Sequence, residues 1–135
     1  MFEEINNSRN IVYTDPYQEI FTVEKSNKKY YVRNAGIRVG IIVYNKQNIL
    51  LVKQYRLIPD KFVWEIPGGG LNEFEEPIDA AKRELYEETD IVDKKLKKYL
   101  FFQPGLDTNY NPTYLFASNK INSFRQLKND EISSI

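Results

Sequence analysis

The chain has 135 residues, of which 41% are hydrophobic and 14% are aromatic, enough apolar surface for the core of one globular domain. Its 19 basic and 19 acidic residues cancel, so no net field attracts a polyanion, and nucleic acid is not an expected partner. The chain contains neither cysteine nor histidine, which excludes disulfides and zinc sites of the usual Cys/His kind. Any bound metal must therefore be held by oxygen.

The amino-terminal segment MFEEINNSRN has neither the basic region nor the apolar region of a secretory signal. The longest apolar run, near residues 39–44, is far too short to cross a membrane. We therefore expect a cytoplasmic protein with no membrane partner.

Short runs of β-branched and aromatic residues fill the first part of the chain and predict strands: IVYT, YQEIFTVEK, KKYYVR, IRVGIIVY and ILLVKQY. Turn-forming residues separate several of these runs, at Asp15-Pro16, at Ser26-Asn27 and at residues 45–48, and this pattern predicts antiparallel hairpins. A further short strand, residues 62–66, leads into Pro67 and three glycines. We expect a flexible or φ-positive loop to follow that strand.

One clear helix is predicted over residues 77–89, with Pro77 at its first position. Ile78, Ala81 and Leu85 recur at helical spacing and predict an apolar stripe that faces the core. Four lysines follow in a turn that we expect to be solvated (94, 95, 97 and 98). The remaining pattern predicts a strand over 99–103, a loop over 104–112 and a strand over 113–118.

Three acidic residues of the predicted helix, Glu84, Glu87 and Glu88, fall in one arc beside the apolar stripe. Like charges at this spacing destabilise a helix by about 0.2–0.5 kcal/mol per pair unless a cation neutralises them. Magnesium prefers carboxylate oxygens together with water and phosphate oxygens. The arc is therefore either a metal site or an ordinary acidic face in solvent.

The spacing around this arc resembles the Nudix box, G-x5-E-x7-R-E-U-x-E-E-x-G-U, where U is a bulky apolar residue. The matching residues are Gly69, Glu75, Arg83-Glu84-Leu85, Glu87-Glu88 and Ile91, and only the second glycine is missing. Asp90 stands in its place, and we expect it to adopt the left-handed conformation at a modest cost in stability. The resemblance implies a mixed α/β Nudix fold, a mixed β-sheet sandwiched by helices, and hydrolysis of a diphosphate bridge.

The resemblance also implies roles for individual residues. It makes Glu84, Glu87, Glu88 and the carbonyl oxygen of Gly68 ligands of Mg²⁺, for which Mn²⁺ is a possible substitute. Arg83 would organise the glutamates and pair with Glu87. Glu75 would tie the preceding loop to the helix.

Outside the box, the chain resembles the ADP-ribose pyrophosphatase branch at residues 54–56, 64–69 and 102–106. This implies an amino-terminal antiparallel β extension, residues 1–34, that reaches across a homodimer, and a catalytic domain over residues 35–135. The candidate substrate-binding residues are Arg56, Glu65, Gly69 and Gly70, with Arg56 on a phosphate. The alternative for Arg56 is a structural ion pair with Glu65.

Two departures from this branch stand out. The loop PGLDTNYN has no glutamate where the branch often holds one, so Asp107 is the candidate general base, with a simple turn as the alternative. Relatives continue past a pair such as Asp130-Glu131 into a strand and a closing helix, whereas this sequence ends at Ile135. We therefore expect the closing helix to be missing and the surface that it would cover to favour association.

The sequence thus favours Mg²⁺-dependent hydrolysis of a small nucleoside-diphosphate compound, and an ADP-ribose-like compound is the leading candidate substrate. Three alternatives remain: a nucleotide-sugar hydrolase of the GDP-mannose type, a hydrolase that removes damaged nucleoside triphosphates, and a module that senses ADP-ribose without cleaving it. The complete set of box glutamates argues against the sensing module.

Overall fold

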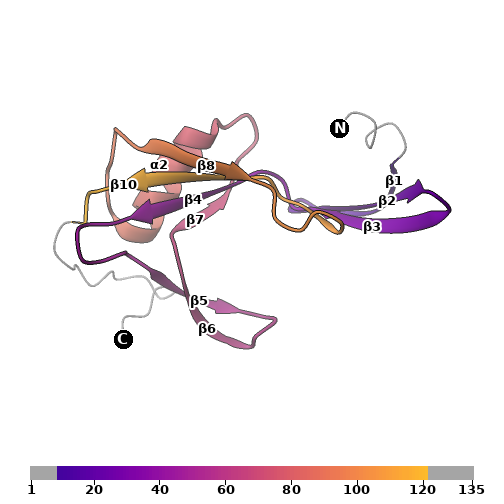
Figure 1. Ribbon diagram of the computed structural model, residues 1–135, viewed down its shortest axis with the longest axis horizontal. Helices are drawn as coiled ribbons and strands as arrows, with labels where there is room; N and C mark the ends of the chain where they lie inside the picture. The colour runs from indigo at the N-terminus through magenta and orange to yellow at the C-terminus, as the bar shows by residue number, and fades with distance from the viewer. Residues whose placement is uncertain (1–8, 122–135) are drawn as a thin grey trace. The chain divides into compact units, whose positions relative to one another are not determined.

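A computed structural model describes residues 9–121 (Figure 1). The described residues form two compact units, the first containing residues 9–37 and Phe102–Thr113, and the second containing Arg38–Phe101 and residues 114–121.

The first unit is a four-stranded sheet. Its strands, in the spatial order β1-β2-β3-β9, are β1 (Asn10–Thr14), β2 (Glu19–Lys25), β3 (Lys28–Asn34) and β9 (Asn109–Tyr110). β2 is antiparallel to both β1 and β3, so the predicted amino-terminal hairpins are confirmed. β9 pairs parallel to β3 within a segment that was expected to be only a loop. Its two residues are too few to produce a strand pattern in the sequence.

The turns of these hairpins follow from local chemistry. Ser26 and Asn27 have positive φ values of 53° and 60°, which suit the tight turn between twisted antiparallel strands. The Asp15 side chain accepts hydrogen bonds from the backbone N–H groups of Tyr17 and Gln18, at 2.7 and 2.9 Å. Both turns lie where the sequence predicts them.

The second unit combines a sheet, a helix and a separate hairpin. The sheet has the order β7-β4-β10-β8, and β5 pairs antiparallel with β6 alone. The elements are β4 (Arg38–Val43), β5 (Val52–Arg56), β6 (Lys61–Glu65), β7 (Gly68–Gly70), α2 (Pro77–Thr89), β8 (Lys97–Phe102) and β10 (Thr113–Ser118). The core lies where α2 packs on this sheet, and its buried members include Val39, Ile41, Val43, Ala80, Ala81, Leu85, Leu96 and Phe116.

The helix confirms its prediction in detail. It begins at Pro77 and ends at Thr89, with Ala81 and Leu85 fully buried and Ile78 packed against the core. Asp90 follows with φ 56° and ψ 12°, and its N–H donates to the carbonyl oxygen of Tyr86 at 2.8 Å. Aspartate therefore closes the helix in the left-handed conformation that the sequence predicted.

The expectation of a flexible loop at Gly68–Gly70 is wrong, because these glycines form β7, antiparallel to β4. Gly68 does have a positive φ, of 159°. A Cβ atom on Gly68 would overlap the carbonyl oxygen of Val39 and lie 2.9 Å from the Cα of Gly40. Side chains at this position would therefore separate the two strands. Gly68 and Gly69 allow close approach of β4 and of Glu84, whereas a Cβ on Gly70 would meet no atom within 4 Å.

The chain after the helix is held by a buried carboxylate. Asp93 accepts hydrogen bonds from the Ser118 hydroxyl at 2.7 Å and from the backbone N–H of Lys95 at 2.8 Å, and Lys120 Nζ lies 3.7 Å away. Burial alone would raise the pKa of Asp93, but these donors and the lysine outweigh it and hold the pKa below its ordinary value. The lysines at 94, 95, 97 and 98 are exposed, as predicted, but the prediction of one turn is wrong for the last two, which begin strand β8.

Residues 9–121 contain one helix, α2, which is not long and apolar enough to cross a membrane. It packs on β4 and β7. The predicted absence of a closing helix after Asp130-Glu131 falls outside the described residues.

Candidate functional site

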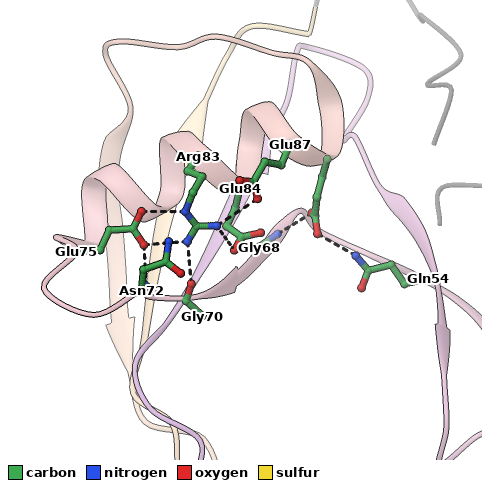
Figure 2. A network of polar contacts seen from close by, with 9 residues as sticks. Gln54, Gly68, Gly70, Asn72, Glu75, Arg83, Glu84 and Glu87 are labelled. Atoms are coloured by element: carbon green, nitrogen blue, oxygen red, sulfur yellow. Dashed lines mark hydrogen bonds and ion pairs between the residues drawn. The ribbon is translucent and has the colours of Figure 1, made fainter. Parts of the chain in front are cut away.

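The acidic side of α2 lies directly on the backbone of β7 (Figure 2). A Cβ atom built on Gly69 would overlap the carboxylate of Glu84, so a side chain at position 69 would displace that carboxylate from its present place on the strand. Gly68 donates its backbone N–H to Glu88 Oε2 at 3.0 Å. Two helix carboxylates one turn apart are thus packed against two consecutive glycines.

Arg83 lies at the centre of a network that joins the helix, β7 and the loop between them, as Figure 2 shows. Its guanidinium contacts Glu75 twice at 2.9 Å, Glu84 at 2.7 Å and Glu87 at 3.2 Å. It also donates to the carbonyl oxygen of Gly70 at 3.0 Å. The ion pair with Glu87 and the tie from Glu75 to the helix are both present as the sequence predicted.

The charges of this network stabilise one another. The hydrogen bonds from Arg83 hold the pKa of Glu75 below its ordinary value, with a further donor in the backbone N–H of Asn72. In return, hydrogen bonding to Glu75 raises the pKa of Arg83 above its ordinary value. The side chains of Arg83, Glu75 and Glu84 are 25%, 15% and 13% exposed, so the pairs are partly shielded from water. The network therefore holds the loop before α2 in a fixed place.

Glu88 has different surroundings. Gln54 donates from its side-chain amide to Glu88 Oε1 at 2.9 Å, and the Gly68 N–H binds the other carboxylate oxygen. Partial burial raises the pKa of Glu88, the Gly68 N–H opposes the rise, and the charge of Glu84 adds to it. Glu84 and Glu88 therefore repel each other, and the two donors that bind Glu88 among the described residues are neutral, while the nearby charge of Arg56 lowers its pKa.

The hairpin β5–β6 presents a second group of polar side chains. Gln54 and Arg56 are two residues apart on β5 and so lie on one face. Arg56 Nε contacts both carboxylate oxygens of Glu65 at 3.0 Å, and a terminal guanidinium nitrogen also contacts Glu65. The structural ion pair considered as an alternative for Arg56 is thus present. Arg56 is still 45% exposed, so the pair leaves part of the guanidinium open to solvent.

The donor set fits a hard divalent cation in its chemistry. It consists of carboxylate oxygens, and the charges of Glu84 and Glu88 repel each other where they approach. However, residues 9–121 contain no group of three acidic side chains already gathered around one point. The three glutamates of the arc, Glu84, Glu87 and Glu88, are not gathered around one point, because Glu84 and Glu87 turn to Arg83.

Asp107 lies in the first unit, in an exposed turn where the N–H of Asn109 donates to the carbonyl oxygen of Gly105 at 3.3 Å. Its role as a general base stays a prediction, as do the substrate-binding roles of Gly69 and Gly70. Sequence reasoning gave no role to Gln54. The sequence does place Gln54 two residues before Arg56 on a predicted strand, and this spacing puts both side chains on the same face.

A family model described as the NUDIX domain matches residues 35–135. An ADP-ribose pyrophosphatase of Bacillus subtilis (strain 168) is 31% identical over 114 residues, which cover 82% of this chain and 62% of that protein. An RNA pyrophosphohydrolase of Bartonella clarridgeiae is 42% identical over 66 residues, covering 44% of this chain and 38% of that protein. A CMP-5'-(N-acetyl-N-hydroxy-3-aminopropyl)phosphonate hydrolase of Streptomyces rubellomurinus (strain ATCC 31215) is 28% identical over 89 residues, which cover 66% of this chain and 43% of that protein.

Among solved structures, one titled "Crystal structure of ADP compounds hydrolase" superposes with a TM-score of 0.65 at 16% identity. The match covers 83% of this chain and 67% of that chain, and it shows a shared fold. The matched part of this chain spans 38–62% of the length of the three relatives named above. The family model covers most of the chain and agrees with the box seen in the sequence and with the helix that carries it: the chain belongs to the Nudix family.

Proposed function

We propose that the chain is a cytoplasmic, Mg²⁺-dependent Nudix pyrophosphohydrolase that cleaves the diphosphate bridge of an ADP-ribose-like compound. The observation that carries this proposal is the packing of the Glu84 and Glu88 carboxylates against the glycines of β7. Like charges destabilise each other at this spacing, so the arrangement costs stability in the metal-free protein. A bound divalent cation would neutralise these carboxylates and remove the repulsion that destabilises the metal-free protein.

Each residue of the site has a proposed task. Glu84, Glu87, Glu88 and the Gly68 carbonyl oxygen would hold Mg²⁺, with Mn²⁺ as a substitute. When bound, the cation neutralises charge on the phosphate oxygens and makes a water more acidic. Arg83 holds the glutamates in place.

The substrate side of the site would be formed by Arg56, Glu65, Gly69 and Gly70. Arg56 would bind a phosphate through the exposed part of its guanidinium, while Glu65 keeps that guanidinium oriented. The oxygen of water would bond to one phosphorus as the bridging P–O bond breaks, and Asp107 is the proposed acceptor of the water's proton. For ADP-ribose the products are AMP and ribose 5-phosphate.

The similarity to an ADP-ribose pyrophosphatase over most of the chain supports an ADP-ribose-like substrate. The RNA pyrophosphohydrolase matches more closely in identity, but over less than half of the chain. The zero net charge does not favour a long polyanion as substrate. ADP-ribose therefore stands first, and an RNA 5′ end is an alternative that the substrate test includes.

A panel assay with Mg²⁺ tests the proposal. We expect ADP-ribose to be cleaved faster than GDP-mannose, a nucleoside triphosphate and a 5′-triphosphorylated RNA, with AMP as a product. If one of the other compounds is cleaved and ADP-ribose is not, that compound takes the place of ADP-ribose as the substrate. Binding of ADP-ribose without any turnover would indicate a sensing module.

We also propose a homodimer formed through the first unit. The outer strand β1 leaves Ile11, Val12 and Tyr13 about half exposed, and Tyr31 on β3 is 61% exposed. A second copy could cover these side chains, since a two-fold axis lets one patch serve both partners. Light scattering coupled to size exclusion tests this, with a dimer mass expected. A monomeric mass at full activity would refute the dimer.

A further inference from the structure

We propose that Gln54 is a positioning residue that holds Glu88 in the orientation needed for metal ligation. This inference rests on the proposed function. Gln54 lies on β5, 34 residues away in sequence from Glu88, and its side-chain Nε2 donates to Glu88 Oε1 at 2.9 Å. Figure 2 shows the Gln54 side chain directed toward the acidic side of α2 from a different strand.

The Gln54 hydrogen bond completes the fixation of the Glu88 carboxylate. A glutamate on a helix has several flexible torsions, and one hydrogen bond leaves its carboxylate free to rotate. In this structure the Gly68 N–H binds Oε2 at 3.0 Å while Gln54 binds Oε1. Two donors from two different strands determine both the direction and the plane of the carboxylate.

A neutral amide suits this position better than a charged donor. Each carboxylate oxygen has two lone-pair directions, so one hydrogen bond per oxygen leaves the other direction free for a cation. A lysine or arginine in place of Gln54 would neutralise Glu88 and compete with the metal. Arg56, two residues along β5, hydrogen-bonds both carboxylate oxygens of Glu65, and it acts on Glu88 through its charge, which lowers the pKa of Glu88.

The hydrogen bond also links two parts of the second unit. The hairpin β5–β6 contains only two strands and pairs with no other described strand. Two-stranded hairpins are marginally stable and need further contacts. Because Gln54 and Arg56 share one face of β5, the contact with Glu88 also helps to hold Arg56 near the acidic helix.

The test substitutes Gln54→Met, which keeps the length of the side chain and removes the donor without adding charge. Gln47→Met is the matched control, because Gln47 is exposed in a turn of the same unit and only its backbone N–H makes a described hydrogen bond. Mn²⁺ binding is measured by calorimetry without substrate, and turnover of ADP-ribose is measured with Mg²⁺. Outer contacts to metal ligands change affinity or activity by about 10–100-fold when they are lost.

We expect Gln54→Met to weaken Mn²⁺ binding about tenfold or more. We also expect it to lower kcat while KM for ADP-ribose changes less than about twofold, since a contact that acts on the reacting centre lowers kcat. Gln54→Lys restores a donor of similar reach but adds charge, so Mn²⁺ binding should stay weak. Unchanged Mn²⁺ affinity in Gln54→Met, or full recovery in Gln54→Lys, would overturn the inference.

A measurement on the unaltered protein covers the case in which a variant does not fold. Mn²⁺ should broaden the NMR signal of the Gln54 side-chain amide and leave that of Gln47 unaffected. Equal effects on the two amides would overturn the inference. If the wild-type protein binds Mn²⁺ but cleaves no diphosphate compound, the proposed function fails while the role of Gln54 toward Glu88 is still decided by the binding data.

Discussion

Replacement of Arg83 by methionine tests the network that joins the loop, β7 and α2. Methionine keeps an unbranched apolar stem and removes all five described contacts of the guanidinium, of which two go to Glu75. The carboxylates of Glu75 and Glu84, 15% and 13% exposed, would lose their cation. Glu87 is 54% exposed and contributes little, because water screens it.

The expected loss follows from this burial. Breaking a fully buried ion pair costs about 3–5 kcal/mol, and breaking an exposed pair costs about 0–1 kcal/mol. Because these side chains are mostly shielded yet still touch water, we expect Arg83→Met to lower the free energy of unfolding by about 2–3 kcal/mol at neutral pH. Urea unfolding in the presence of a chelator measures this value, since bound metal would replace part of the lost positive charge.

The effect should depend on pH with a defined sign. Arg83 holds the pKa of Glu75 below its unfolded value, so this stabilisation is fully present above the unfolded pKa. It is lost as the pH falls through the folded pKa. The difference between the wild type and Arg83→Met should therefore shrink below about pH 4. A loss under about 0.5 kcal/mol at neutral pH, the size of an ordinary surface substitution, would refute the reasoning.

Three further substitutions test single features of the second unit. Gly69→Ala should displace the Glu84 carboxylate, which is the far end of a flexible side chain, so it should lower the free energy of unfolding by no more than about 1 kcal/mol yet weaken Mn²⁺ binding. Gly70→Ala, with no atom within 4 Å of the new Cβ, should leave Mn²⁺ binding unchanged, and equal Mn²⁺ affinities of the two variants would show that Glu84 does not need this space. Asp93→Asn should cost about 1–3 kcal/mol at neutral pH, and because the folded pKa of Asp93 is depressed, its effect should fade as the pH drops through that pKa. A difference that stays constant across the acid range would contradict the assignment. Asp90→Gly should stabilise the protein by about 0.5–1 kcal/mol, since glycine adopts the left-handed conformation without strain, and a lower melting temperature would count against that view.

Local chemistry explains which parts of the fold the sequence predicts. The turn at Ser26 and Asn27 and the helix from Pro77 to Thr89 depend on neighbouring residues, so short-range patterns were sufficient. The strand Gly68–Gly70 was missed because strand patterns are carried by side chains, which glycine lacks. Its conformation is set by pairing with β4, a contact that no local pattern contains.

The same distinction applies to the candidate site. Helical spacing placed Arg83 beside Glu87, and the structure contains that pair. It did not reveal that Glu88 meets Gln54 and Gly68, because those contacts depend on how β5 and β7 approach the helix. The three glutamates are not gathered around one point for a related reason: Glu84 and Glu87 bind Arg83, and helical spacing alone does not show which carboxylates that guanidinium reaches.

The most direct test of the proposed function is the turnover of ADP-ribose at saturating Mg²⁺ by the wild type and by Glu88→Gln. Asp79→Asn is the matched control, because it makes the same chemical change on the exposed side of α2, where Asp79 contacts only Lys82 through its side chain. We predict that Glu88→Gln lowers kcat at least about a hundredfold with the fold intact, and that Asp79→Asn stays within about twofold of the wild type. Near-normal turnover by a folded Glu88→Gln protein would show that the acidic side of α2 is not the catalytic element.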